Sequence, residues 1–165
     1  MPNHESVPPA NTARRACLLA AGLLVISAPL AAAPAVALPA PPVGAQAVDW
    51  DHFGEPSLST ARRANVAASR ALLPAAGVGQ TVDTRLYRLP GDAAWERVLG
   101  HYQRSTSPAW QTLPGADRVD TGNPARQQRF AAVDDAGQRF AIVFLPPAGE
   151  VRDGVLMVLR TVAAR

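Results

Sequence analysis

Two stretches near the C-terminal end of the chain are apolar at consecutive positions rather than at alternate ones. Residues 140–145 read FAIVFL, and residues 155–162 read VLMVLRTV. A strand with one face in water alternates apolar with polar side chains, and these stretches do not. We therefore expect strands with both faces covered, so the fold needs a layer of structure on each side of a sheet.

Side chains alternate between the two faces along a strand. This places one set of apolar residues of the first stretch on one face and a second set on the other, namely Phe140, Ile142 and Phe144 against Ala141, Val143 and Leu145. We expect a core in which the following residues are buried together: Trp95, Val98, Leu99, Phe140, Ile142, Phe144, Val155, Met157 and Leu159.

A helix that can cover one face is predicted at about residues 92–104. Its apolar residues, from Trp95 to Tyr102, recur at i, i+3, i+4 and i+7, which is the spacing of a single helix face. Asp92 stands where a helix N-cap residue is expected. Pro90 and Gly91 separate this helix from the strand predicted before it.

The other face needs a cover of its own. A second helix at residues 59–73 is the internal candidate, and a second copy of the chain or a partner protein is the alternative. The apolar stripe of this helix is impure, because Arg62 and Arg63 fall on the same side as Val66.

The remaining signals are those of strands. A tight turn at residues 134–137 separates two strand-like stretches and predicts a hairpin, with Gly137 available for a positive φ. The expected strands are Val82–Leu89, Ala109–Leu113, Gln128–Val133, Gln138–Leu145 and Val155–Val162. The fold class is therefore α+β: one main helix (about 92–104) packed on a mostly antiparallel sheet of four to five strands, with the second helix at 59–73.

The N-terminal part of the chain has the pattern of an export signal. Arg14 and Arg15 precede an uncharged, largely apolar run, which is typical of a secretory signal peptide. An uncleaved membrane anchor is the alternative, but prolines interrupt the apolar stretch that it would need. Cleavage is expected after Ala37, with Ala47 as the alternative, because small residues occupy the required positions before both.

The expected organisation therefore has three parts. Residues 1–37 are a signal peptide (alternative end 47), residues 38–58 are an extended linker or arm, and residues 59–165 are a single small α+β domain. The mature protein is expected in the periplasm or outside the cell, with no stable membrane span after cleavage.

The composition excludes several classes of protein. The single cysteine, Cys17, lies in the signal segment, so the mature domain has neither a disulfide framework nor a thiol nucleophile. All 16 basic residues are arginine, and they are scattered among the acidic ones. Nucleic-acid binders concentrate basic residues in a patch, so no nucleic-acid partner is expected.

Few residues are candidates for chemistry. Asp49, Asp51, His52 and Glu55 form the densest set of potential ligands, but their spacing matches no calcium loop, so no metal site and no cofactor are expected. His101 stands in no recognised nucleophile motif. Long loops often bind ligands, and the stretch 114–127 is such a loop. The residues expected at a binding site are Trp110, Asp117, Asp120 and Arg126.

The absence of a catalytic motif favours a non-catalytic exported envelope accessory or binding protein, whose ligand is not given by the sequence. The alternative is a small periplasmic hydrolase that uses His101 with a nearby serine or carboxylate. The expected partner is an envelope protein, or a second copy of the chain, bound through a face of the sheet.

Overall fold

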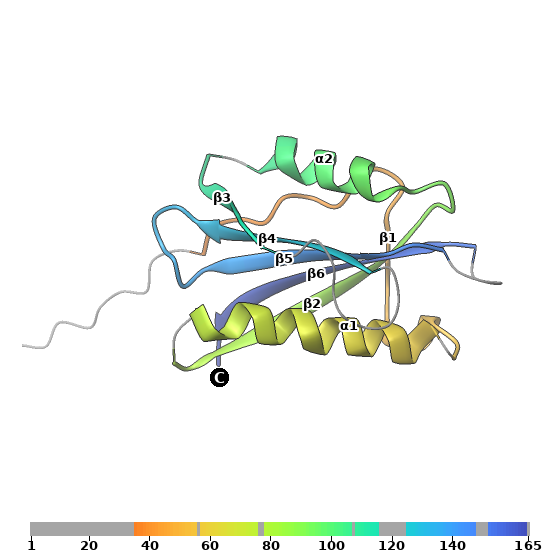
Figure 1. The fold of residues 1–165 in the computed structure, drawn as a ribbon, viewed down its shortest axis with the longest axis horizontal. Helices are drawn as coiled ribbons and strands as arrows, with labels where there is room; N and C mark the ends of the chain where they lie inside the picture. The colour runs from red at the N-terminus through yellow and green to blue at the C-terminus, as the bar shows by residue number, and fades with distance from the viewer. Residues whose placement is uncertain are drawn as a thin grey trace, which may run out of the picture. The chain divides into compact units, whose positions relative to one another are not determined.

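A computed structural model describes residues 35–55, 57–75, 78–106, 108–115, 125–147 and 152–164. They form a six-stranded antiparallel sheet with a helix on each face (Figure 1). In chain order the elements are β1 (Gln46–Val48), the 3-10 turn η1 (Trp50–His52), α1 (Ser57–Leu72), the 3-10 turn η2 (Leu73–Ala75), β2 (Gln80–Leu89), α2 (Trp95–Ser105), β3 (Trp110–Leu113), β4 (Arg126–Ala132), β5 (Arg139–Leu145) and β6 (Gly154–Ala163).

The strand order across the sheet is β1-β2-β6-β5-β4-β3, so the two doubly apolar strands, β5 and β6, lie at its centre. The α+β class is confirmed, and six strands replace the four to five that we expected. The additional strand is β1, which pairs with β2 from Gln46↔Arg88 to Val48↔Leu86. It lies within the stretch 38–58, whose proline-rich and alanine-rich composition gives no strand signal.

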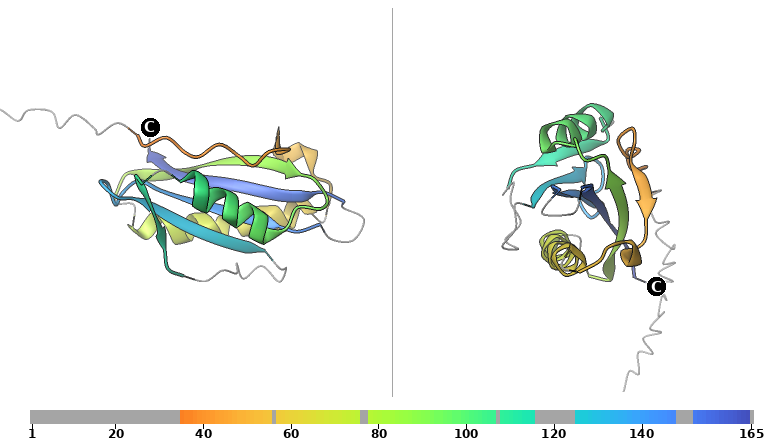
Figure 2. Two further views of the ribbon diagram at one scale, coloured as in Figure 1. Left: turned by 90° about the horizontal axis from the view of Figure 1, so that it is seen from above. Right: turned by 90° about the vertical axis from the view of Figure 1, so that its right-hand side faces the viewer.

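The helix predicted at 59–73 is confirmed as α1, and it packs on β5 and β6 (Figure 2, right). Its buried face consists of small residues, because Ala61, Ala64 and Ala68 precede Leu72 at helical spacing and all are nearly inaccessible to solvent. Alanine lets the helix axis approach the sheet closely. Val66 does not supply apolar surface to the core, since it is 48% exposed on the outer face, where Arg62 and Arg63 also lie.

The helix predicted at about 92–104 begins later than expected. The α2 helix runs from Trp95 to Ser105, and its N-cap residue is Ala94 rather than Asp92. Asp92 lies instead in a turn that the Ala93 N–H closes by donating to the carbonyl oxygen of Pro90 at 2.8 Å. The Asp92 carboxylate pairs with Arg97 at 3.1 Å, on the outer surface of α2.

The hairpin predicted around residues 134–137 is confirmed by β4 and β5. Phe130 and Phe140 face each other across it, with ring centroids 4.4 Å apart and an interplanar angle of 8°. The turn is not closed by a positive φ at Gly137. The Asp135 carboxylate closes it by accepting a hydrogen bond from the Gly137 N–H at 2.9 Å.

The two apolar sets of β5 lie on opposite faces of the sheet, as predicted. The prediction that the β6 residues Val155, Met157 and Leu159 pack together with the phenylalanines of β5 was wrong. Val155, Met157 and Leu159 lie on the α1 side of the sheet, away from Phe140 and Phe144. The register between β5 and β6 explains this. Leu156 lies directly opposite Phe144, so Leu156 faces the α2 side and its neighbours in β6 face the α1 side. The expected single core is therefore two cores, one on each side of the sheet.

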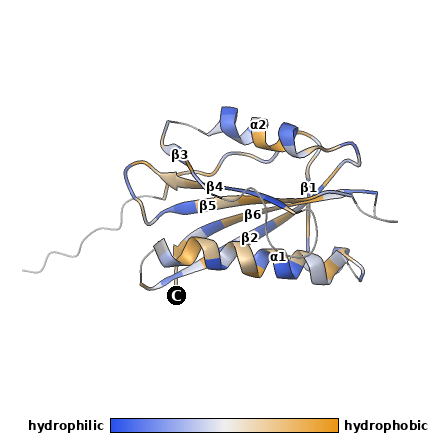
Figure 3. Cartoon of the chain, in the orientation of Figure 1, coloured by the Kyte–Doolittle hydropathy of each residue, from blue (hydrophilic) through white to orange (hydrophobic). Residues whose placement is uncertain are grey.

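Figure 3 shows hydrophilic and hydrophobic residues interspersed along both helices, as expected for helices with one face on a sheet. Among the residues that the structure describes, no helix combines the length and the hydropathy needed to cross a membrane.

Candidate functional site

Residues 35–45, which we call the strap, lie along the face of the sheet that α2 also covers (Figure 2, left, in orange). The strap forms neither helix nor strand. Pro39, Pro41 and Pro42 have no N–H groups, so the strap is unsuited to a sheet ladder. It ends in a turn in which the Ala45 N–H donates to the carbonyl oxygen of Pro42 at 3.0 Å, and β1 follows.

Two aromatic side chains donate hydrogen bonds to main-chain oxygens of the strap. The indole N–H of Trp110, the first residue of β3, donates to the carbonyl oxygen of Ala37 at 3.1 Å. Nε2 of His101, on α2, lies 2.9 Å from the carbonyl oxygen of Ala40. A carbonyl oxygen only accepts hydrogen bonds, so Nε2 carries the proton and donates it. Both contacts depend on the path of the strap and not on its side chains.

A third contact comes from the turn between β4 and β5. The Val36 N–H donates to Oε1 of Gln138 at 2.7 Å. The amide of Gln138 is oriented by Asp135, whose Oδ2 accepts from Nε2 of Gln138 at 3.1 Å. This hydrogen bond, with one from the Gly137 N–H, holds the pKa of Asp135 below its ordinary value. The strap is thus held by side chains from three separate elements.

An apolar surface lies beneath the strap. The strap residues Val36, Leu38 and Ala45 are partly buried against the core on the α2 side of the sheet. The buried members of this core are Leu89, Trp95, Val98, Tyr102, Trp110, Phe130, Ala132, Phe140, Ile142, Phe144, Leu156 and Val158. The strap, the edge of α2 and this aromatic surface together define what we call the α2 groove.

Trp110 is fixed in the α2 groove by its ring as well as by its N–H. Its indole packs edge-on against Phe140, with centroids 4.8 Å apart and an interplanar angle of 86°. The side chain is 8% exposed. The donor therefore has one orientation in which both the aromatic contact and the hydrogen bond to the strap are made.

Tyr102 is the one fully buried tyrosine of this core, and its hydroxyl has no hydrogen-bond partner among the residues that the structure describes. Burial, with Tyr87 nearby on β2, raises the pKa of Tyr102 well above its ordinary value of 10.0. An unsatisfied buried hydroxyl costs about 1–3 kcal/mol.

The strap does not fill the α2 groove completely. A cavity of about 130 Å³ lies between the end of the strap, at Pro42 and Val43, and the start of α2. Its wall includes Leu89 and Val98, and the ion pair formed by Asp92 and Arg97 stands among its lining residues. Val43 leaves the cavity available because its own side chain is 99% exposed.

The structure does not bring the predicted binding residues together at one site. Trp110 lies in the α2 groove. Arg126 begins β4, partly buried and paired in register with Phe144. Asp117 and Asp120 lie outside the described residues. The strap and Gln138 were missed, and within the strap only the apolar positions at Val36 and Leu38 hinted at a contribution to the core.

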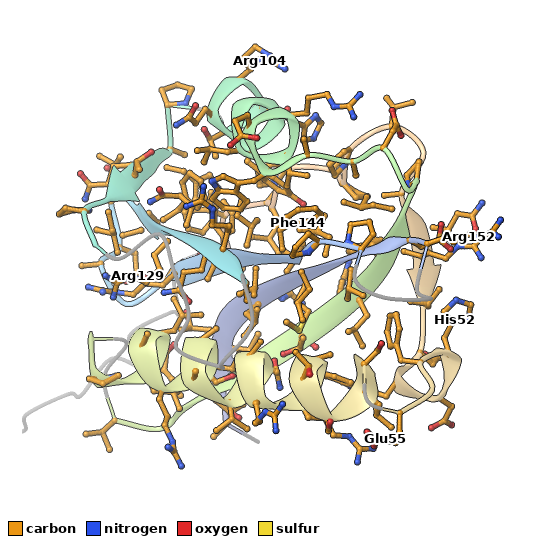
Figure 4. All side chains as sticks on the ribbon, turned by 45° about the vertical axis from the view of Figure 1, so that its right-hand side comes forward. His52, Glu55, Arg104, Arg129, Phe144 and Arg152 are labelled. Carbon is orange, nitrogen blue, oxygen red and sulfur yellow. The ribbon has the colours of Figure 1, made fainter. Side chains whose placement is uncertain are left out.

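A second cavity, of about 180 Å³, lies at the N-terminal end of α1 (Figure 4). Its polar lining includes His52, Glu55 and an exposed ion pair in which Arg88 Nε lies 3.6 Å from Oδ2 of Asp153. Within the described part of the chain, no three residues of metal-binding type come close enough together to hold an ion. The ligand set considered at Asp49–Glu55 therefore has no metal-binding geometry.

His101 lies apart from both cavities, since it lines neither of them. Its ring packs edge-on against Tyr102, with centroids 5.3 Å apart. Nε2 of His101 donates to the Ala40 carbonyl oxygen, so Nδ1 is the ring nitrogen left to act as a general base.

No protein-family model matches the chain, and comparisons with curated proteins and with solved structures give no significant match.

Proposed function

We propose that this protein is a non-catalytic, exported binding protein that serves as an accessory of the cell envelope, and that the α2 groove is its binding site. The observation that carries the proposal is a set of side-chain hydrogen bonds with main-chain atoms of one extended segment. Trp110 and His101 donate to its carbonyl oxygens, and Gln138 accepts from one of its N–H groups. Hydrogen bonds from several elements to a peptide main chain are typical of a peptide-binding site.

Export is supported by the basic and apolar pattern that precedes Ala28. The strap adds an argument about where cleavage occurs. Cleavage after Ala47 would remove the strap and most of β1, and cleavage after Ala37 would remove the Ala37 carbonyl oxygen and the Val36 N–H that Trp110 and Gln138 hold. The periplasm or the extracellular space is the proposed location, with a mature chain that begins before Val36 and so keeps these contacts.

A binding role is favoured over the hydrolase that uses His101. The proton on Nε2 is committed to a carbonyl oxygen of the chain itself, and neither cavity described above contains the ring. No observation on the described residues favours the hydrolase.

Both faces of the central strands are covered, by α1 on one side and by α2 with the strap on the other. A partner is therefore proposed at the α2 groove, and not on an open face of the sheet.

The proposal is tested by photo-crosslinking in cells, followed by fractionation. A photoreactive residue replaces Val43, which is 99% exposed beside the α2 groove, and in a matched variant it replaces Val66, which is 48% exposed on the far side of α1. The expected result is an envelope-fraction adduct from position 43 that is absent from position 66 and weakened by Trp110→Phe. A protein retained in the cytoplasm, or adducts from position 66 alone, would contradict the proposal.

A further inference from the structure

We propose that the α2 groove recognises extended, proline-containing peptide segments through their main chain, and that the strap is an internal occupant which such a segment displaces. This inference rests on the proposed binding role and names the class of ligand. Its first support is the spacing of the two carbonyl oxygens that Trp110 and His101 hold.

The carbonyl oxygens held by Trp110 and His101 belong to Ala37 and Ala40, three residues apart. A polyproline II helix has three residues per turn, so carbonyl groups at i and i+3 point in the same direction. Two donors on one wall of a groove can therefore reach both. A β-strand would turn the two groups to opposite sides, because its side-to-side period is two residues.

The sequence of the strap favours the same conformation. Proline fixes φ near the polyproline II value, and a residue before proline is biased away from the helical region. Pro39, Pro41 and Pro42 thus restrict themselves and also Leu38 and Ala40. A segment that is already extended loses little conformational entropy on binding, which is why aromatic grooves select such segments.

Displacement of the strap breaks its hydrogen bonds with Trp110, His101 and Gln138 and its partly buried apolar packing on the core. The side chains of Ala37 and Ala40 are exposed, and the strap is only partly buried elsewhere. Its connection to the sheet is the short strand β1. An attached segment competes at an effective concentration of order mM. A free peptide therefore binds weakly until the strap is loosened.

The cavity beside Pro42 and Val43 indicates which ligands bind better than the strap. Leu89, Ala93 and Val98 give it apolar walls. A segment with a larger apolar side chain directed into this space would fill it. One additional buried methylene corresponds to about a fourfold gain in affinity.

The test uses the full-length protein and a fluorescent peptide with the sequence of residues 34–45, PAVALPAPPVGA. Leu38→Asp loosens the strap, because Leu38 packs against the core. Ala35→Asp is the matched control, since it adds the same charge to an exposed position of the strap. The Leu38→Asp protein is expected to bind the peptide at least about tenfold more tightly than the wild type or Ala35→Asp, because it lacks the internal competitor.

Two further arms test the chemistry of recognition. Adding Trp110→Phe to Leu38→Asp is expected to weaken peptide binding about tenfold, because the donor to a main-chain oxygen is lost. A peptide with leucine in place of the valine that corresponds to Val43, so that its longer side chain can turn into the cavity, is expected to bind about fourfold more tightly than the parent. A peptide in which the prolines are replaced by alanine is expected to bind more weakly.

The inference is overturned if folded Leu38→Asp protein does not bind the peptide, or binds it no better than the wild type does. Should Leu38→Asp lose cooperative unfolding, Leu38→Ala is assayed and judged by the same outcomes. Concentration-dependent dimers in place of peptide binding would show that the groove accepts only the strap of a second copy, which also overturns it. Crosslinks from position 43 that persist after such a failure would leave the binding role intact and remove only the proline-peptide ligand.

Discussion

The indole N–H of Trp110 donates a hydrogen bond to the carbonyl oxygen of Ala37 at 3.1 Å, across a separation of 73 residues. This contact ties the last residue of the predicted signal peptide to the strand β3, at the opposite edge of the sheet from β1. It follows that the folded unit extends to the strap, and that loosening the strap alters the aromatic surface beneath it.

Trp110→Phe should remove this hydrogen bond and keep an aromatic ring, a smaller one, against Phe140. We expect the free energy of unfolding to fall by at least about 0.5–1.5 kcal/mol, which is typical of one hydrogen bond, with lost packing added to it. We also expect faster proteolytic cleavage within residues 35–45, measured by mass spectrometry. Trp50→Phe, on the α1 side of the sheet, is the control and should leave strap cleavage unchanged.

Phe144→Ala should be among the most destabilising single substitutions. Phe144 is 2% exposed and stacks on Trp95 with centroids 6.5 Å apart. Truncation of a buried phenylalanine costs about 3–5 kcal/mol, which chemical denaturation measures directly. Val133→Ala, at a position that is 54% exposed, is the control and should change stability by less than about 0.5 kcal/mol. A loss below about 1 kcal/mol for Phe144→Ala would mean that the strand register is misassigned.

Tyr102→Phe should flatten the alkaline limb of the stability curve. The pKa of Tyr102 is raised in the folded protein, so above the ordinary value of 10.0 the unfolded chain releases a proton that the folded chain retains. Stability is therefore full below pH 10 and falls as the pH rises further, by about 1.4 kcal/mol per pH unit for one proton. Below pH 10 the variant should be more stable than the wild type, by up to about 1–3 kcal/mol, because it removes a buried hydroxyl that has no partner among the described residues. Identical alkaline slopes for the two proteins would contradict this account.

Asp135→Asn should alter the acid limb. The hydrogen bonds from Gln138 and Gly137 lower the pKa of Asp135 below 3.8, so the carboxylate contributes stability above pH 3.8. That contribution is lost as the pH falls through the lowered pKa. The wild type should therefore lose stability more steeply below pH 3.8 than the variant does, measured by thermal melting between pH 2 and pH 6. Asp134→Asn is the control, because it removes a neighbouring charge without these hydrogen bonds; matching curves for wild type and Asp135→Asn would refute the assignment.

Much of the architecture followed from the sequence because apolar patterning reports burial. The doubly apolar stretches required covers on both sides, and α1 and α2 supply them. Patterning does not, however, say which set of alternating residues faces which side. Val155, Met157 and Leu159 were placed on the wrong side for this reason, since only the register of β6 against β5 decides it.

The candidate site was less accessible to prediction because its contacts run to main-chain atoms. Ala37 and Ala40 contribute carbonyl oxygens, which every residue possesses, so no residue type marks them. The strap resembles a linker in composition, and β1 is too short to show a period. Asp92 was predicted to cap the helix because of its residue type alone. The hydrogen bond from the Ala93 N–H to the Pro90 carbonyl oxygen places Asp92 in a turn before the helix.

The indole N–H resonance of Trp110 offers the most direct measurement of the central claim, that the α2 groove holds an extended peptide main chain which can be exchanged. In the wild-type protein this proton is hydrogen-bonded to the strap, so its exchange with solvent should be slow by NMR. Leu38→Asp should make that exchange fast, and addition of the peptide of residues 34–45 should make it slow again. A Trp110 N–H whose exchange is unaffected by Leu38→Asp, or is not slowed by the peptide, would contradict the account.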